Sequence, residues 1–343
     1  MKIIQILPEL ILGGVERHVI DLSNELVKQG HEVLVVSAGG QMERQLNSQV
    51  QVYHLPVQKK NLFSGLYCVM RLACLIKSGG WQIMHAHSRV PAWIANWTSE
   101  IVNIPWIYTA HALYSLNFGL YPLKKAKLVI CISKAVQQHL QKFLPHESVV
   151  LYNGLSEIKH RWHNADSPIP TFLCVGRLTR LKGIDALIET FAMLLKNGYS
   201  NWRLILVGDG PLRQELENKC QMLQMQELVH FAGYQENVVA ELLNCSCYLL
   251  PSLSEGMGLT LIQGAKMGVP IFASNIPAVR EIALTPEKLI EPGSVSAWYK
   301  TLSQFLDGDR DGFCQFDTDK LLLESEMAEK VTSLYRHVMQ QVM

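Results

Sequence analysis

Short apolar runs alternate with amphipathic stretches along almost the whole chain. The run KIIQIL near the start has the length and composition of a buried strand. The stretch VERHVIDLSNELVKQG after it has apolar residues at helical spacing and ends at Gly30, and EVLVVS follows as a second strand-like run. The runs QIMHAH, PWIYTA, KLVICI and SVVLY repeat the strand pattern, with helix-like segments between them. Such alternation predicts a doubly wound parallel sheet.

The alternation stops after Tyr152 and then begins again. Residues 156–170 are polar, contain prolines and have no period, so we predict a linker there. Beyond it, TFLCVG, RLILVGDG, LVHFAG, CYLLPS and VPIFAS have strand character and are separated by helical patterns. We therefore predict an α/β protein with two Rossmann-like domains, at residues 1–160 and 170–320. A final helix, at about 321–343, is expected to pack back onto the first domain.

The composition narrows the class of protein. The length of 343 residues suits two domains of about 150 residues each. A formal net charge of +1 gives no reason to expect a nucleic-acid partner. The start MKIIQILPEL lacks the zones of a signal peptide, and no uninterrupted apolar run reaches the length of a membrane span. The eight cysteines are scattered, as free thiols are in a reducing compartment, so we expect a cytoplasmic protein.

Ligands of open parallel sheets bind beyond the carboxyl ends of the strands, so the loops there are the candidate sites. The first such loop, PELILGGVERH, is not a GxGxxG dinucleotide fingerprint. Its pair Gly13 and Gly14 nevertheless opens a helix, and bare backbone N–H groups at a helix N-terminus attract anions. A flexible loop without a ligand explains the glycine pair equally well.

The loop GRLTRLKG after the strand TFLCV carries two cations, Arg177 and Lys182, between Gly176 and Gly183. A guanidinium that forks onto oxygens, an ammonium and a helix N-terminus together would suit a diphosphate. The alternative is that these are solvated surface cations, as Arg180 in the same loop illustrates. The GDGP turn after the next strand is expected to be architecture rather than chemistry.

Histidines and aspartates raise the question of a metal site. His85 and His87 alternate by two and share one face of a strand end, but no third ligand stands at a recognisable spacing. His111, just past another strand end, could line a cleft or be a hydrogen-bonded structural histidine. The stretch that begins at Asp307 resembles the opening of a calcium loop, yet its twelfth position is Thr318. We therefore expect a solvated loop there and no metal site.

Eight motifs occur in the order found in one enzyme family. They are GGVE, TAH, a helix opened by Ser133, the Asn153–Gly154 pair, GRLTRLKG, GDGP, FAGY and PSLSEGMGLTLIQGAKMGVP. Together they resemble the family-four glycosyltransferases, which are retaining enzymes of GT-B architecture, with two Rossmann-like domains facing each other across a cleft. The resemblance covers the chain from Lys2 to about Glu291, and it extends to bacterial enzymes that build surface polysaccharide on lipid carriers.

The resemblance implies roles for individual residues. Gly14 would offer its backbone N–H to the donor phosphate or line the acceptor side, and Arg177 and Lys182 would bind the diphosphate of a nucleotide-sugar. His111 would contact the sugar near its reacting face. Glu255, with the backbone that follows it, would hold hydroxyls of the donor sugar.

One position departs from the family pattern. The glutamate that grips the ribose in the family's Glu-x7-Glu pattern is Gln263 here. The full set implied for donor binding is Gly14, Arg177, Lys182, Tyr234, Glu255, Gly256, Met257, Gly258, Leu259 and Gln263. The catalytic set is His111, Arg177, Lys182 and Glu255.

The implied function is retaining transfer of a hexose-type sugar from a UDP-sugar to a saccharide or lipid-linked acceptor, with no metal and no other cofactor. Two other functions stay open: a nucleotide-sugar epimerase or hydrolase of the same fold, and a non-catalytic nucleotide-sugar-binding homologue in which Gln263 marks decay.

Residues 112–127 interleave aromatic side chains with lysines. This composition suits peripheral contact with a membrane, and packing against the neighbouring domain explains it as well.

Overall fold

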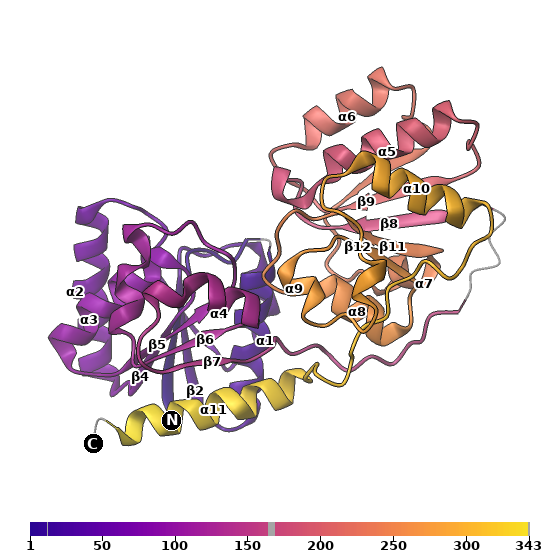
Figure 1. Ribbon diagram of the computed structural model, residues 1–343. Helices are drawn as coiled ribbons and strands as arrows, with labels where there is room; N and C mark the ends of the chain where they lie inside the picture. The colour runs from indigo at the N-terminus through magenta and orange to yellow at the C-terminus, as the bar shows by residue number, and fades with distance from the viewer. Residues whose placement is uncertain (12, 164–168, 342–343) are drawn as a thin grey trace. The chain divides into compact units, whose positions relative to one another are not determined.

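The computed structural model describes residues 1–11, 13–163 and 169–341. The chain forms two α/β units (Figure 1): unit 1 comprises residues 1–156 and 321–343, and unit 2 comprises residues 157–320.

The sheet of unit 1 has seven parallel strands in the order β3-β2-β1-β4-β5-β6-β7. The strands are β1 (Lys2–Ile6), β2 (Glu32–Ser37), β3 (Gln51–His54), β4 (Ile83–Ala86), β5 (Trp106–Ala110), β6 (Leu128–Cys131) and β7 (Ser148–Val150). The order reverses between β1 and β4, as in Rossmann folds. The sequence pattern predicted every one of these strands except β3. That strand has the polar sequence QVYH, lies at the sheet edge and pairs only with β2, so it lacks the apolar run of a central strand.

Helices cover both faces of this sheet. On one face α1 (Gly14–Lys28) packs beside α11 (Glu324–Gln340), and their apolar side chains share a core with strand residues such as Ile3 and Ile107. On the other face α2 (Leu62–Gly79) packs against α3 (Arg89–Val102) (Figure 1). The shorter helix α4 (Lys134–Leu140) links β6 to β7.

Helix α2 is long and apolar enough, by length and composition alone, to cross a membrane, with 18 residues and a mean hydropathy of 1.3. It carries Arg71 and Lys77, which is why no uninterrupted apolar run is visible in the sequence. Its buried residues are Gly65, Cys68, Val69, Leu72, Ala73 and Ile76. Their helical spacing and the position of α2 between β3 and β4 are those of a crossover helix that covers a sheet.

Two segments of unit 1 lie side by side where the chain leaves this unit and where it returns. Leu155 forms a parallel bridge with Leu323, and the Ser156 hydroxyl donates to Glu324 Oε1 at 2.5 Å. A Cβ on Gly154 would lie 2.7 Å from the Glu324 Cα, so only glycine permits this approach. The start of α11 is thereby fixed to the end of the first segment of unit 1.

Unit 2 has five parallel strands in the order β10-β9-β8-β11-β12. They are β8 (Thr171–Val175), β9 (Arg203–Val207), β10 (Val229–Gly233), β11 (Cys247–Leu250) and β12 (Ile271–Ala273), all of which the sequence pattern predicted. The helices are α5 (Ile184–Lys196), α6 (Arg213–Met222), α7 (Val239–Asn244), α8 (Leu259–Met267), α9 (Pro277–Arg280) and α10 (Val295–Leu306). The helical spacing in α5 predicts a core face of Ile184, Leu187, Ile188, Phe191, Leu194 and Leu195, and all of these are buried except Leu195, which is half-buried.

The predicted linker is in part an ordered segment of unit 2. Residues 164–168 lie outside the described residues. Before them, the Trp162 backbone N–H donates to the Met267 carbonyl and its indole N–H donates to the Cys245 carbonyl, both at 2.8 Å. The indole of the half-buried Trp162 thus has its N–H satisfied by unit 2. Trp162 therefore ties the described part of this segment to unit 2.

All eight cysteines are free, and seven of them are buried. Burial raises the pKa of the Cys131 and Cys174 thiols to about 12, so both stay protonated at neutral pH. These cysteines behave as small apolar core residues.

Candidate active site

The loops of unit 2 meet at the carboxyl edge of its sheet. The Leu178 N–H donates to the Asp209 carbonyl at 3.0 Å, which joins the loop after β8 to the loop after β9. The Leu253 N–H donates to the Leu181 carbonyl at 2.8 Å, which joins the loop after β11 to the same β8 loop. The motifs GRLTRLKG, GDGP and PSLSEGMG thus form one connected surface.

Two glycines allow these loops to touch. Gly183 has a φ of +64°, and a Cβ there would lie 2.2 Å from the Pro251 carbonyl oxygen. Gly208 has a φ of +131°, and a Cβ there would lie 2.0 Å from the Gly176 carbonyl oxygen. Only glycine tolerates both the positive φ and the close approach. The GDGP turn, which contains Gly208, therefore serves packing.

Lys182 and Glu255 form an ion pair across this junction. The Lys182 ammonium donates to Glu255 Oε1 at 2.5 Å, and the Ser252 hydroxyl donates to the same oxygen at 2.7 Å. The Lys182 side chain is 25% exposed and the Glu255 side chain 9%. The resemblance gave these residues separate tasks, phosphate binding and sugar binding. The structure joins them, so Lys182 fixes the orientation of the Glu255 carboxylate.

Arg177 stands free in the same loop. It follows Gly176 just past the end of β8 and is exposed, and its guanidinium has no hydrogen-bond partner among the described residues. A free, planar guanidinium at the carboxyl edge of the sheet can fork onto two oxygens of an anion. Arg180, two residues before Lys182, is exposed as well.

The glycine-rich loop leads directly into α8. Gly258 precedes the helix with a φ of +76°, and Leu259 is its first residue. The first backbone N–H groups of α8 lack partners within the helix, which favours an anion there. Met257 as a whole residue is 2% exposed, so its side chain packs inside unit 2. Gln263 lies half-buried just over one turn into α8.

The other predicted residues of this edge are peripheral to the ion pair. Gly256 lies in the same loop between Glu255 and Met257. Tyr234 directly follows β10 and is 39% exposed. Its position past a strand end places it on the same edge of the sheet as the other loops of unit 2.

In unit 1, helix α1 begins at Gly14, as the glycine pair suggests. A Cβ on Gly13 would lie 2.4 Å from a carboxylate oxygen of Glu16, so this carboxylate folds back over the start of the helix. Negative charge is favoured at this end of a helix. A phosphate at the Gly14 N–H would therefore share its place with Glu16 or displace it.

Four buried histidines gather on the sheet face that α1 and α11 cover. His85 and His87 lie at the end of β4, His111 follows β5, and His18 belongs to α1. The prediction that His85 and His87 share a face is confirmed, since their ring centroids are 4.1 Å apart. Burial is the main cause of the lowered pKa of all four imidazoles. The pKa of His18 falls to about 4, although a hydrogen bond with Asn153 opposes this shift. All four imidazoles are therefore neutral near pH 7.

A chain of hydrogen bonds runs through this cluster. His111 Nε2 lies 3.0 Å from His87 Nδ1, His87 Nε2 lies 2.8 Å from Gln5 Oε1, and Gln5 Nε2 lies 2.9 Å from the Tyr335 hydroxyl. The same hydroxyl lies 2.7 Å from His85 Nδ1, and His85 Nε2 lies 2.7 Å from Thr109 Oγ1.

His87 has two further histidines near it in space, although no third ligand accompanies His85 and His87 at a recognisable sequence spacing, and the absence of a metal stays a prediction. Side-chain nitrogens of His18, His87 and His111 lie within 4.8 Å of one another, a spacing that could hold a metal ion. The three residues come from α1, β4 and the loop after β5, so sequence spacing could not reveal the group. His87 and His111 already turn their nearest nitrogens toward each other in a hydrogen bond.

Sequence reasoning also missed Gln5 and Tyr335. Gln5 is fully buried in the apolar run KIIQIL, and Tyr335 is fully buried on α11. A polar residue inside an otherwise apolar strand was the available signal, because a buried amide requires hydrogen-bond partners. At the Asp307 loop the structure agrees with the expectation of a solvated loop. The loop is exposed, and Asp309 accepts from the Asp311 N–H at 2.8 Å.

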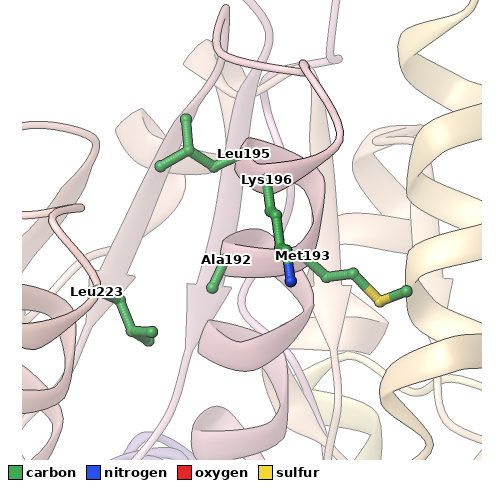
Figure 2. A pocket seen from close by; sticks show the side chains of 5 residues that line it. All are labelled: Ala192, Met193, Leu195, Lys196 and Leu223. Atoms are coloured by element: carbon green, nitrogen blue, oxygen red, sulfur yellow. The ribbon is translucent and has the colours of Figure 1, made fainter.

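A pocket of unit 2 lies away from these residues. It measures about 370 Å³ and is lined by Ala192, Met193, Leu195, Lys196 and Leu223 (Figure 2). Four of these belong to the C-terminal part of α5. The N-terminus of α5 follows the β8 loop, so this pocket lies toward the opposite edge of the sheet from Lys182 and Glu255.

Two family models together match residues 12–313, which is most of the chain. Residues 12–157 match the model of Glycosyltransferase Family 4, and residues 156–313 match that of Glycosyl transferases group 1. The chain belongs to the family-four glycosyltransferases. Its two parallel-sheet α/β units are those of the GT-B fold.

Individual relatives agree with this membership. The glycosyltransferase is 25% identical over 345 residues to an uncharacterized glycosyltransferase of Haemophilus influenzae, covering 95% of this chain and 96% of the relative. It is 30% identical over 167 residues to the O-antigen biosynthesis glycosyltransferase WclY of Escherichia coli, covering 46% of this chain and 45% of WclY. The solved structure of Anabaena HepE in complex with UDP and glucose superposes with a TM-score of 0.74 at 19% identity, covering 100% of this chain and 98% of HepE.

Proposed function

We propose that this glycosyltransferase moves a hexose-type sugar from a UDP-sugar to a saccharide or lipid-linked acceptor, with retention at the anomeric carbon, in bacterial glycan biosynthesis. The observation that carries this proposal is the junction in unit 2 where the Lys182–Glu255 pair lies in loops shared with the free Arg177. Cations beside a fixed carboxylate suit a ligand with a diphosphate at one end and hydroxyls at the other.

The chemistry follows from where charge develops. Cleavage of the bond between the sugar and the diphosphate builds positive charge on the anomeric carbon and negative charge on the leaving oxygen. Arg177, Lys182 and the N-terminus of α8 can stabilise that negative charge. The leaving oxygen takes the proton of the acceptor hydroxyl, and the new bond forms on the face that the diphosphate leaves.

Two cations at the diphosphate, Arg177 and Lys182, make a divalent metal unnecessary for this step, so we propose a metal-independent enzyme. Treatment with EDTA should leave UDP release unchanged. Loss of activity with EDTA and its recovery with a divalent ion would contradict this part of the proposal and would direct attention to His18, His87 and His111.

The donor and acceptor classes rest on the relatives. HepE was solved with UDP and glucose, and WclY takes part in O-antigen biosynthesis. By analogy we propose a UDP-sugar donor and a glycan acceptor. His111, at the end of β5, would contact the sugar near its reacting carbon, and Gln263 would contact the ribose.

We further propose a cytoplasmic enzyme that touches the membrane peripherally through residues 112–127. In this segment Phe118 is 72% exposed and Tyr121 46%, and the two rings stack at 5.8 Å. Lys124 and Lys125 follow at the end of the same turn. Exposed aromatic rings beside lysines suit the headgroup region of an anionic bilayer.

A donor screen tests the function. A UDP-sugar that binds should raise the Tm of the protein in proportion to the logarithm of ligand excess. That same sugar should then give UDP release that depends on an added acceptor, and the product should keep the anomeric configuration of the donor. Acceptor-independent release would indicate a hydrolase, and absence of binding by every UDP- and GDP-sugar would contradict the proposal.

A further inference from the structure

In the hydrogen-bond chain of unit 1, the orientation of the Gln5 amide decides which group donates and which accepts in each bond. The chain links Gln5, His87 and His111 on one side and Gln5, Tyr335 and His85 on the other. The side chains of Gln5, His85, His87 and Tyr335 are all 0% exposed, so water cannot substitute for a missing partner. Every member must therefore match a donor to an acceptor.

The tautomers on one side follow step by step from the Gln5 carbonyl. Gln5 Oε1 can only accept, so His87 Nε2 carries a hydrogen and donates to it. A neutral imidazole has one N–H, so His87 Nδ1 holds a lone pair and accepts from His111 Nε2. His111 is neutral too, and its Nδ1 is therefore left as an acceptor.

The other side of the chain completes the pattern. The Gln5 amide N–H donates to the Tyr335 oxygen, the Tyr335 O–H donates to His85 Nδ1, and His85 Nε2–H donates to Thr109. Burial raises the pKa of the Tyr335 hydroxyl, which keeps its proton available for donation. Turning the Gln5 amide over would reverse every hydrogen bond in the chain. A single amide therefore sets three imidazole tautomers together.

We propose that Gln5 and Tyr335 are positioning residues that hold His111 as its Nε2–H tautomer and so present His111 Nδ1 as a hydrogen-bond acceptor for a substrate hydroxyl. The contact with a substrate rests on the proposed function, whereas the tautomer does not. Tyr335 belongs to α11, so this helix acts on His111 through two intermediate residues. Loss of the acceptor at Nδ1 should lower kcat/KM roughly tenfold, the effect of one neutral hydrogen bond.

The test is nitrogen NMR of the full-length, ligand-free protein labelled with ¹⁵N-histidine, in which single His→Gln variants assign the rings. In the wild type His111 should show a protonated Nε2 and an unprotonated Nδ1. In Tyr335→Phe the Gln5 amide loses its acceptor and can turn over, so His111 should show a mixture of both tautomers. In Gln5→Glu the carboxylate favours a doubly protonated His87, whose Nδ1–H would donate to His111 and move the His111 proton to Nδ1.

A matched control lies on the same helix. Thr332 donates to Gln29 Oε1 at 2.9 Å, so Thr332→Val removes a hydrogen bond of α11 that is outside the chain. It should leave the His111 tautomer and kcat/KM unchanged even where it lowers stability as much as Tyr335→Phe does. If Tyr335 had only a structural role, Tyr335→Phe and Thr332→Val should have the same effect on the His111 tautomer and on kcat/KM.

Two results would overturn the proposal. One is a wild-type His111 protonated at Nδ1. The other is an unchanged His111 tautomer in Tyr335→Phe. This second result is available even if Gln5→Glu does not fold. Failure of the proposed function would be seen in a different measurement, as the absence of any Tm shift with nucleotide-sugars. The two failures can be told apart because the tautomer is measured without a nucleotide.

Discussion

Among single residues, the two cations of the GRLTRLKG loop differ in what surrounds them. Arg177 is exposed and without a partner among the described residues, while Lys182 is bonded to Glu255. Arg177→Ala should lower kcat by about two orders of magnitude, as removal of a charge-stabilising donor does (~3 kcal/mol), with the Tm unchanged. Lys182→Ala should lower kcat similarly and also lower the Tm, because it leaves a carboxylate that is 9% exposed without its cation.

Steady-state kinetics and thermal unfolding of both variants check this prediction. Arg180→Ala is the matched control, since it removes an exposed cation from the same loop and should change neither quantity. Near-normal turnover in both Arg177→Ala and Lys182→Ala would contradict the diphosphate assignment.

Gln263 is the second residue with a specific expectation. A carboxylate there would accept charge-assisted hydrogen bonds, which are about twice as strong as neutral ones. Gln263→Glu should therefore lower KM for the donor up to tenfold with little change in kcat, because the ribose is remote from the reacting carbon. Gln263→Ala should raise KM. If Glu abolishes activity and Ala is silent, Gln263 does not face the ribose.

The sequence predicted which charged residues of unit 2 belong to the site, but it did not predict which of them contact each other. Arg177, Lys182 and Glu255 stand in recognisable loops, so their place at the sheet edge follows from the alternation of strands and helices. The Lys182–Glu255 pair depends on Gly183 packing against Pro251, a contact between residues far apart in sequence. The roles of Gln5 and Tyr335 depend in the same way on a contact across 330 residues.

At the scale of elements, the strands were predictable wherever both faces are buried. Central strands such as β1 and β11 are continuous apolar runs, whereas β3 at the edge reads QVYH and gives no such pattern. Helix α5 was predictable because its apolar residues lie on one face. The partner that a helix face covers is set by tertiary packing, which is why the contact of α11 with α1 and Gln5 could not be derived from its pattern.

The segment 112–127 carries the prediction about membranes. Lys124, Lys125 and Lys127 should each contribute about 1 kcal/mol to binding an anionic bilayer. Their combined replacement by Gln should therefore weaken flotation with vesicles that contain anionic lipid, and added salt should weaken wild-type flotation.

The matched control for flotation replaces three exposed lysines elsewhere, Lys196, Lys300 and Lys330, and so removes the same charge. Equal flotation of the wild type and both triple variants would favour packing against protein over contact with a membrane.

At the scale of the whole molecule, the buried histidines govern stability against acid. The pKa of His18 is about 4 in the folded protein and 6.5 when exposed, so between these values the unfolded chain binds more protons. The free energy of unfolding should therefore rise with pH from about 4 to 6.5, by about 3 kcal/mol from His18 alone. His85, His87 and His111 act in the same direction. Asp21, whose pKa burial raises to about 6, acts in the opposite direction.

Urea unfolding at pH 5, 6 and 7 measures this slope. His18→Gln removes one titrating group, so the free energy of unfolding should rise less steeply with pH. The decrease in slope should correspond to at most one bound proton. His230→Gln is the control, because this side chain is exposed and lies outside the buried cluster. A free energy of unfolding that falls as pH rises from 5 to 7 would contradict the prediction.

The return of the chain to unit 1 has a consequence for synthesis on the ribosome. Unit 2 is one continuous segment, whereas the core of unit 1 includes Met327, Val331 and Tyr335, which are translated after all of unit 2. At roughly 5–20 residues per second, on the order of ten seconds or more separates the two parts of unit 1. During that interval the part of the sheet face that α11 covers, which includes Gln5, stays exposed on the nascent chain. Unit 2 can therefore complete its fold before unit 1, although the first segment of unit 1 is translated earlier.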